Sequence, residues 1–333
     1  MEIVDITKNV QIDSFYTGYG GSDIKASFMY KGKRYMFKFQ NVIEDEKRNS
    51  LNQSYSDNVI SEDIGCKIFK SLGIETQNTF QAIYDGRLIV ACENFIPEGY
   101  GICEFEDLEE SARALGMITS EKARTPKLNQ IQKIFDNIET LENIRQEAIE
   151  RYWDTFVGDS LIGNFDRHTG NWGYLINQDT KDVKLAPVYD CGSSLYPQMS
   201  EEGAKKVLGV QKEIDRRIYE FPKAALMVNG EKVAYHEFLC SHMVKECDEA
   251  IKRIYPRIDK EKICQIIDEN PALGVGKKEF LKTMTQQRIE KILQPAYAQI
   301  MSRQKSYMQD AIQTASKQYG HEQDIEQERE YSL

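Results

Sequence analysis

Three polar side chains in one stretch of the chain have the types that phosphoryl transfer requires. Asp166 is followed five positions later by Asn171, and Asp190 stands two positions before Gly192. Carboxylate and amide oxygens are the hard ligands that Mg²⁺ prefers. A carboxylate held beside a hydroxyl can also accept its proton. These residues therefore indicate a site where a metal-bound phosphate meets a hydroxyl nucleophile.

Kinase-like folds use the same spacing around ATP, with the first Asp as proton acceptor and the Asn and second Asp as Mg²⁺ ligands. Asp and Asn are also common in turns and helix caps, so the spacing has a plain structural explanation as well. The context favours function, because the segment lies between an apolar helical run and two strand-like runs, 172–176 and 183–188. Binding groups belong in such loops and strand ends.

A glycine-containing loop stands before the first predicted hairpin. Gly20, Gly21 and Ser22 precede two alternating apolar runs, 25–30 and 34–39, which a short turn joins. Glycines at this place let backbone amides approach phosphates without obstruction by side chains. The loop is a candidate phosphate-binding loop, and a plain surface turn explains it equally well.

Lys38 is the candidate phosphate-binding cation. It stands between Phe37 and Phe39 in the second predicted strand, so its side chain points to the opposite face from theirs. Its place, one hairpin after a glycine loop, matches the kinase lysine that contacts ATP. The alternative is an outward-facing lysine on a half-exposed strand. Glu62, on a predicted helix that ends at Gly73, could pair with it or simply be exposed.

A second predicted hairpin leads to a candidate hinge between two lobes. Its last strand runs LIVACENF and breaks at Pro97 and Gly99. Residues 92–95 would offer backbone groups and an aromatic face to adenine, although Phe95 could equally belong to the core. From about residue 104 the apolar pattern becomes helical, and it predicts helices over 140–162 and 231–254, among others.

These elements predict an α+β, bilobal fold of the protein-kinase type. Residues 1–98 form a β-rich N-lobe with the glycine loop, hairpins, one helix and hinge strand. Residues 99–319 form a mostly helical C-lobe with the catalytic and metal-binding loops. Residues 320–333 are highly charged without an apolar period, which predicts a disordered tail.

Bulk properties limit the classes of partner. The composition of the 333-residue chain, 41% hydrophobic and 29% charged, is ordinary for a soluble globular protein. A net charge of −10 provides no global basic field for nucleic acid or anionic membrane. The chain contains no apolar run long enough for a membrane span, and its first residues do not resemble a signal peptide. The seven cysteines form no C-x₂-C pair. We therefore expect a cytoplasmic protein that binds neither membrane nor nucleic acid directly.

Four segments carry a resemblance to a known family. GNFDRHTGNWGYL followed by LAPVYDCGSSL is similar to the core motif of HipA-like serine/threonine kinases. That family includes toxin kinases of bacterial toxin–antitoxin modules and related effector kinases. YGGSDIKASFMYKGKRYMFKF resembles its glycine loop and strand lysine, and VACENF resembles its hinge. The resemblance implies the use of ATP and Mg²⁺, a protein substrate with a serine or threonine hydroxyl, and an antitoxin as a candidate partner.

The resemblance also assigns roles to individual residues. In the catalytic region, Asp166 would be the base, and Asn171 and Asp190 would hold Mg²⁺. His168 lies inside the catalytic-loop motif, where it would shape the loop or touch phosphate rather than act as the general base. The residues that would bind the nucleotide are Gly20, Gly21, Ser22, Lys38, Glu93 and Phe95.

Two departures from the family pattern matter. Longer HipA proteins carry an N-terminal subdomain that contacts the antitoxin, whereas here only residues 1–17 precede the glycine loop, as expected for a short form. Some members switch themselves off by phosphorylating a serine of that loop. The nearby hydroxyls here are Thr17 and Ser22, and a phosphate on either would add about −1.5 to −2 charges beside the ATP phosphates. We therefore expect autophosphorylation.

Two other functions fit parts of the pattern. A similar D-R-H-x-x-N occurs in phosphatidylinositol kinases, so the substrate could be a lipid or another small molecule. The acidic net charge and the lack of a basic membrane-binding helix count against a phosphoinositide. The chain could also be a non-catalytic, kinase-shaped binding partner. The presence of Asp166, Asn171, Asp190 and Lys38 together argues against that alternative.

Overall fold

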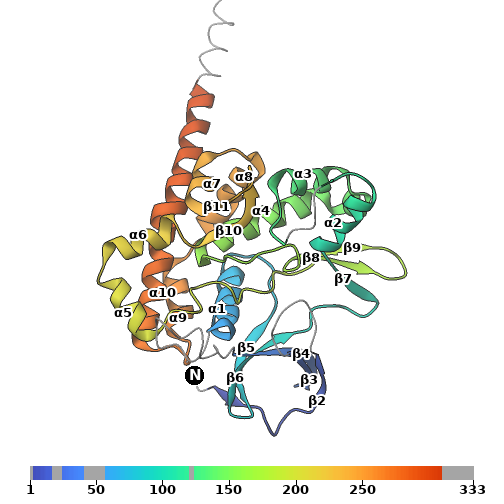
Figure 1. Cartoon of the computed structure of the whole chain (residues 1–333), viewed down its shortest axis with the longest axis vertical. Coiled ribbons are helices and arrows are strands. Elements are labelled where there is room, and N and C mark those ends of the chain that lie inside the picture. The colour runs from blue at the N-terminus through green and yellow to red at the C-terminus, as the bar shows by residue number, and fades with distance from the viewer. Residues whose placement is uncertain (1–2, 17–24, 41–56, 120–123, 310–333) are drawn as a thin grey trace, which may run out of the picture.

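The computed structural model of the chain describes residues 3–16, 25–40, 57–119 and 124–309. Figure 1 shows a β-rich part at the bottom, formed by the first strands, and a larger helical part above it. Helix α1 (Asn58–Ser71) packs on strands of the lower part and on helices of the upper part. The predicted α+β fold, β-rich first and helical second, is confirmed. The lobe boundaries at residues 98 and 99 remain predictions, and the predicted tail 320–333 lies outside the described residues.

The β-rich part is a six-stranded sheet in the order β1-β5-β6-β4-β3-β2, antiparallel except for the β1–β5 pair. Its strands are β1 (Val4–Asp5), β2 (Ile12–Tyr16), β3 (Lys25–Tyr30), β4 (Lys33–Phe39), β5 (Thr79–Tyr84) and β6 (Arg87–Glu93). Two-residue turns, Lys31-Gly32 and Asp85-Gly86, close the two hairpins with all four φ angles positive. Positive φ at both central residues gives the turn the twist that adjacent strands need. Both predicted hairpins are therefore confirmed.

The two faces of this sheet have different partners. Phe37, Phe39, Ile89 and Ala91 belong to a separate apolar cluster on one face. Lys38 pairs in register with Val90, which belongs to the main core with α1. Because successive side chains on a strand point to opposite faces, the alternation that buries the phenylalanines turns Lys38 towards α1.

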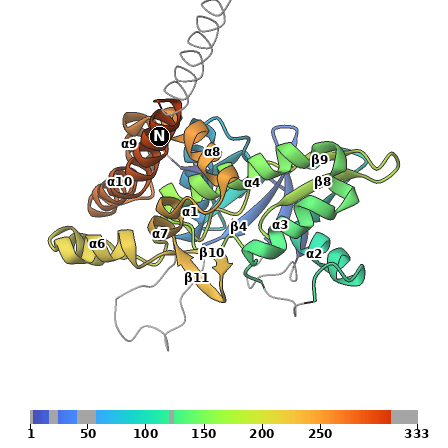
Figure 2. The same ribbon diagram turned by 90° about the horizontal axis from the view of Figure 1, so that it is seen from above.

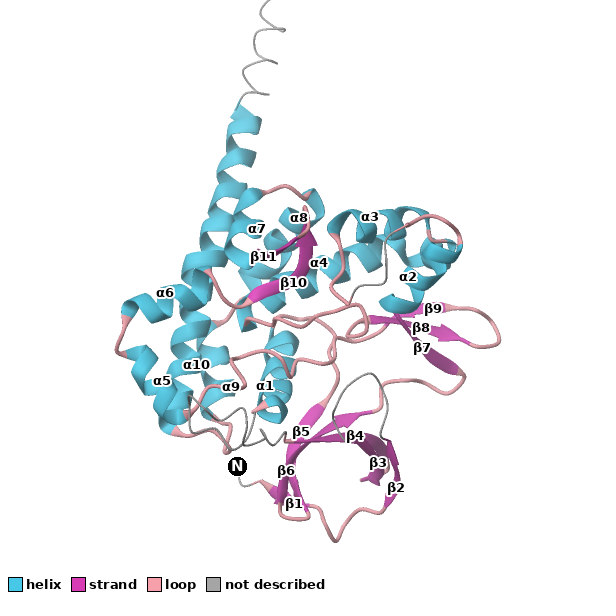
Figure 3. Ribbon diagram, in the orientation of Figure 1, coloured by secondary structure: helices cyan, strands magenta, loops and turns pink. Residues whose placement is uncertain are grey.

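The helical part contains two small sheets as well as helices (Figure 3). The three-stranded sheet is β7 (Tyr100–Glu104), β8 (Gly173–Asn177) and β9 (Val183–Leu185), and the hairpin is β10 (Lys223–Val228) with β11 (Glu231–Ala234). The main helices are α2 (Phe105–Ala114), α3 (Leu128–Asn137), α4 (Arg145–Ile162), α5 (Glu201–Leu208), α6 (Gln211–Tyr219), α7 (Tyr235–Ser241), α8 (Lys245–Ile254), α9 (Lys260–Asp268) and α10 (Val275–Arg288). Seen from above, α9 and α10 lie at the opposite side of the molecule from β8 and β9 (Figure 2).

Several predicted element boundaries were wrong. The helix expected over 231–254 is interrupted, because residues 231–234 form the strand β11 and His242 adopts a φ of 55° between α7 and α8. The helix expected from Thr140 begins at Arg145 after a 3₁₀ segment, Glu139–Ile144. After a π-helical segment, Ile289–Leu293, the last helix continues through 294–309 and projects from the body (Figure 1). No helix among the described residues combines the length and apolar character needed to cross a membrane.

Two glycines allow α1 to approach the centre of the molecule closely. A Cβ on Gly65 of α1 would lie 2.7 Å from Cys191 Cβ, and a Cβ on Gly158 of α4 would overlap the ring of Phe69. Both positions are inside helices, where glycine costs about 1 kcal/mol relative to alanine. Glycine stands at both positions despite this cost, because any larger side chain would push α1 away from α4 and from the segment around Asp190. Helix α1 carries Glu62.

We expect Gly158→Ala to lower the free energy of unfolding by about 1–3 kcal/mol, because overpacking against Phe69 outweighs the gain in helix propensity. Urea denaturation followed by circular dichroism measures the change. Gly209→Ala is the matched control, because a Cβ there meets only ordinary contacts at 3.6 Å or more. The control should leave stability unchanged or raise it by up to about 1 kcal/mol. A Gly158→Ala variant as stable as the wild type would contradict the packing argument.

Candidate active site

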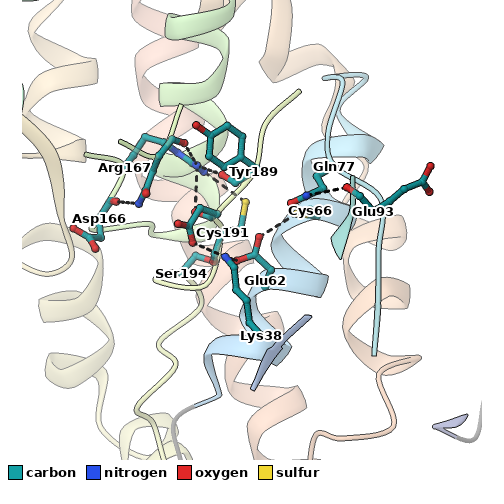
Figure 4. Close-up of polar contacts among 12 residues, drawn as sticks. Lys38, Glu62, Cys66, Gln77, Glu93, Asp166, Arg167, Tyr189, Cys191 and Ser194 are labelled. Carbon is teal, nitrogen blue, oxygen red and sulfur yellow. Dashed lines mark hydrogen bonds and ion pairs between the residues drawn. The ribbon is translucent and has the colours of Figure 1, made fainter. Parts of the chain in front are cut away.

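Lys38 connects the two parts of the molecule through two carboxylates. Its Nζ lies 3.1 Å from Glu62 Oε2 and 3.0 Å from Asp190 Oδ1 (Figure 4). Glu62 is fully buried, Lys38 is almost so, and Asp190 is partly exposed. Burial acts to lower the pKa of Lys38, but Asp190 and Glu62 more than offset it and raise that pKa well above its usual value. The lysine is therefore held as a cation. Of the two alternatives for Glu62, pairing with Lys38 or exposure on its helix, the structure shows the pairing.

Asp166 lies in a loop that begins where α4 ends. Gly163 closes the helix in the left-handed conformation, at φ 66°, and turns the chain into the loop. The Asp166 N–H donates to Asn164 Oδ1 at 3.1 Å, and the Asp166 carbonyl accepts from Asn171 Nδ2 at 2.8 Å. The backbone on both sides of the carboxylate is thus held by side chains. Because Nδ2 of Asn171 is used in this way, Oδ1 is the atom that remains to ligate a metal.

Asp159 and Arg167 form a buried ion pair beneath this loop, and neither was singled out from the sequence. Arg167 Nε and Nη2 donate to the two carboxylate oxygens of Asp159 at 2.9 and 3.0 Å. Arg167 Nη1 donates to the carbonyls of Asn171, Tyr189 and Asp190 (Figure 4). Burial opposes the charge, but Asp159 raises the pKa of Arg167 well above its usual value. The available signal was an Asp among the apolar residues at the end of this helix, followed by an Arg in the loop after it.

Both ring nitrogens of His168 lie within hydrogen-bond distance of another nitrogen. Its Nδ1 accepts from the Gly170 N–H at 3.1 Å, and its Nε2 lies 2.7 Å from Arg124 Nη2. Burial lowers the pKa of His168, and Arg124 adds to this effect while Asp166 opposes it. Protonation would place an N–H against the Gly170 N–H, so the geometry favours a neutral ring. With Nδ1 occupied by the loop backbone, the ring shapes the loop.

The candidate hinge is only partly available to a nucleotide. The Asn94 N–H donates to the Arg34 carbonyl at 2.9 Å and the Glu93 N–H donates to the Asn78 carbonyl at 2.8 Å, so these two backbone donors are already bonded. The Glu93 carbonyl accepts from Gln77 Nε2 at 3.0 Å and keeps a second lone pair (Figure 4). The Glu93 side chain pairs with Lys33 at 2.7 Å rather than turning inward.

An aromatic pair lies beside this hinge. The rings of Phe95 and Tyr189 stack with centroids 5.5 Å apart, so Phe95 contacts the residue that precedes Asp190. The Tyr189 hydroxyl is buried and has no hydrogen-bond partner within the described part of the chain. A buried hydroxyl without a partner is costly, and a bound nucleotide is one group that could satisfy it. Tyr189 was not singled out from the sequence. Gly20, Gly21 and Ser22, the predicted phosphate loop, lie outside the described residues, as does Thr17.

The donor set fits Mg²⁺. Asn171 Oδ1 and the Asp190 carboxylate are hard oxygen ligands, and Mg²⁺ usually takes one or two such protein groups together with waters and phosphate oxygens. In the described ranges no group of three or more His, Cys, Asp or Glu side chains could hold a metal by itself. Gly192, two residues after Asp190, leaves room for this segment, because a Cβ there would lie 3.3 Å from Glu62 Oε2. ATP fits the same surroundings, since the Lys38 ammonium group would provide a cation for its phosphates.

Comparisons with known proteins point to one family. The model of the HipA-like C-terminal domain family matches residues 17–269. The serine/threonine-protein kinase CtkA of Helicobacter pylori is 36% identical over 318 residues, which cover 95% of this chain and 93% of the relative. The crystal structure of a Helicobacter pylori proinflammatory kinase CtkA is similar with a TM-score of 0.82 at 35% identity, over 90% of this chain and 98% of that one.

A more distant structure shares the fold. The toxin–antitoxin protein HipA of Shewanella oneidensis, solved with HipB and operator DNA, gives a TM-score of 0.50 at 18% identity. The match covers 84% of this chain and 66% of that chain. At this identity the likeness concerns the fold alone.

We expect the pKa of His168 to lie below its ordinary value of about 6.5. A depressed pKa in the folded state contributes to the stability of the protein. This contribution is complete above about pH 6.5, the pKa of the unfolded state, and is lost as the pH falls through the lower pKa of the folded state. An NMR titration of the imidazole, assigned with His168→Gln, measures the value. Arg124→Gln should raise it, because one cation beside the ring is removed. A His168 pKa at or above the ordinary value would contradict the assignment of a neutral, loop-shaping ring.

Proposed function

Because the chain belongs to the HipA-like C-terminal domain family, as its motifs predicted, we propose that its site transfers phosphate from Mg²⁺-ATP to a serine or threonine hydroxyl of a protein. The chain is thus a serine/threonine protein kinase, as is the relative that is 36% identical to it. The observation that carries the proposal is the contact of Lys38 with both Glu62 and Asp190. This contact joins the strand cation of the first part to the metal-binding segment of the second, as phosphoryl transfer requires.

Each side of the site has a distinct task in binding the nucleotide. The Glu93 carbonyl, Phe95 and Tyr189 would hold the adenine, with the Tyr189 hydroxyl gaining a partner. Lys38 would contact the phosphates, and Glu62 keeps its ammonium group in place. Asn171 Oδ1 and the Asp190 carboxylate would hold Mg²⁺, which neutralises charge on the phosphate oxygens.

Asp166 would act on the protein substrate. Its carboxylate orients the serine or threonine hydroxyl and accepts the proton as the O–H bond breaks. The hydroxyl oxygen forms a bond to the γ-phosphorus, and the bond from that phosphorus to ADP breaks. His168 would take no proton in this step, because its Nδ1 already accepts from Gly170.

The proposal extends to autophosphorylation, and a toxin–antitoxin role is a further prediction. Autophosphorylation at Thr17 or Ser22 would place negative charge where ATP phosphates bind, and would therefore reduce activity. The role as the toxin of a toxin–antitoxin module, and with it an antitoxin partner, stays a prediction. The relative of that class, solved with HipB, shares 18% identity. The cytoplasmic location also stays a prediction.

We expect Asp166→Ala to lower kcat by about 10²–10⁴-fold, the usual contribution of a positioned general base. Transfer of ³²P from labelled ATP to proteins of a bacterial lysate, followed by phosphoamino acid analysis, measures the activity. Asp154→Asn is the matched control, because Asp154 lies on α4 and pairs with Arg253. Labelled phosphoserine or phosphothreonine should appear with the wild type and the control. Equal labelling by the Asp166→Ala variant would refute the assigned role.

We expect the intact mass of the wild-type protein to rise by one or more phosphates after incubation with Mg²⁺-ATP. Asp166→Ala should remain unmodified under the same conditions. The modified peptide should contain Thr17 or Ser22, and replacement of both by alanine should abolish the mass change. An unmodified wild-type mass would rule out autophosphorylation without affecting the proposed transfer to other proteins.

A further inference from the structure

The buried ion pair of Asp159 and Arg167 reaches all three residues that the proposed chemistry assigns to the second part of the molecule. Arg167 Nη1 donates to the Asn171 carbonyl at 3.1 Å and to the Asp190 carbonyl at 3.2 Å. Asp159 Oδ1 accepts from Asn164 Nδ2 at 3.0 Å, and Asn164 Oδ1 in turn accepts from the Asp166 N–H. The base and both metal ligands are therefore connected to one pair of side chains.

The two metal ligands share a single donor atom of this pair. Asn171 and Asp190 are separated in sequence by β8 and β9, and neither strand holds the two residues together directly. The common contact is Nη1 of a planar guanidinium whose opposite edge is fixed on the Asp159 carboxylate. Because that group is rigid, the separation of the two backbones depends on the guanidinium.

Energetics favour a geometric role for the pair. Asp159 is 1% exposed and Arg167 is 7% exposed, so both charges have lost nearly all their water. The desolvation of such a pair commonly cancels its attraction, and well-packed apolar residues are often as stabilising. A cation close to a Mg²⁺ site gives no electrostatic advantage for binding a second cation either.

We propose that Asp159 and Arg167 form a positioning pair that sets the spacing of Asn171 and Asp190 and thereby the affinity of the nucleotide-bound protein for Mg²⁺. This inference rests on the proposed function, since it takes these two residues as the metal ligands. The pair touches neither substrate nor metal. It acts through the backbone of the residues that do.

Arg167→Lys tests the proposal, because lysine keeps the charge beside Asp159 but lacks the planar fork that reaches the carbonyls. The probe is a non-hydrolysable ATP analogue, whose binding is measured by calorimetry in EDTA and then at rising Mg²⁺ concentrations. The variant should bind the analogue in EDTA as the wild type does. Its half-saturating Mg²⁺ concentration should rise by about 10–100-fold, as is usual when groups that orient metal ligands are lost.

The matched control is Arg253→Lys. Arg253 also forms an ion pair with an Asp of α4, with Nη2 2.7 Å from Asp154 Oδ1, but this contact involves none of the site residues. The control should bind both the analogue and Mg²⁺ as the wild type does. Hydrogen exchange without metal provides a second readout, in which Arg167→Lys alone should speed exchange in segments 166–171 and 189–192.

Should Arg167→Lys fail to fold, Asp159→Asn takes its place, since it removes the charge that fixes the guanidinium and keeps the side-chain shape. Like Arg167→Lys, Asp159→Asn should raise the half-saturating Mg²⁺ concentration. A wild-type Mg²⁺ dependence in the folded variant would overturn the positioning role and leave the proposed function standing. A variant that loses analogue binding in EDTA as much as in Mg²⁺ would overturn the positioning role too, because such a loss would indicate general unfolding. A wild-type protein that binds no analogue at any Mg²⁺ concentration would overturn both.

Discussion

The hydrogen bonds of one buried guanidinium organise the candidate active site. Arg167 neutralises Asp159 at the end of α4 and donates to carbonyls of both loops that carry candidate site residues. A buried arginine without its carboxylate would be strongly destabilising, so its partner must come from a fixed element. The last turns of α4 provide that element. The position of the loops therefore depends on where this helix ends, and Gly163 sets that end.

The first part of the molecule reaches the same centre through α1. Gly65 and Gly158 let α1 lie closer to α4 and to the segment after Asp190 than any other residues would allow. This approach brings Glu62 into the interior, where its charge is balanced by Lys38. Packing and electrostatics are thus coupled, because a shift of α1 would leave a buried carboxylate without its cation.

Much of this arrangement follows from local patterns in the sequence. The alternation around Lys38 determines which way its side chain points, and the Asp85-Gly86 dipeptide determines a hairpin. The helix between Asn58 and Ser71 was likewise predictable from its apolar stripe. The later boundaries were not, because the break at His242 depends on contacts of its ring with Asp248 and Gln299, which lie on other helices.

The sequence by itself was enough to predict the type of chemistry, because hard oxygen ligands, a cation and a base stand at the spacings that kinase-like folds use. It also determined the order of the two lobes, since strand and helix periods are local properties. Only the tertiary structure decided that Glu62 faces Lys38, that the Asn94 N–H is already bonded, and that Asp159 and Arg167 join the loops. These contacts link residues far apart in the chain or on different elements. Their partners are fixed by packing, which no local pattern records.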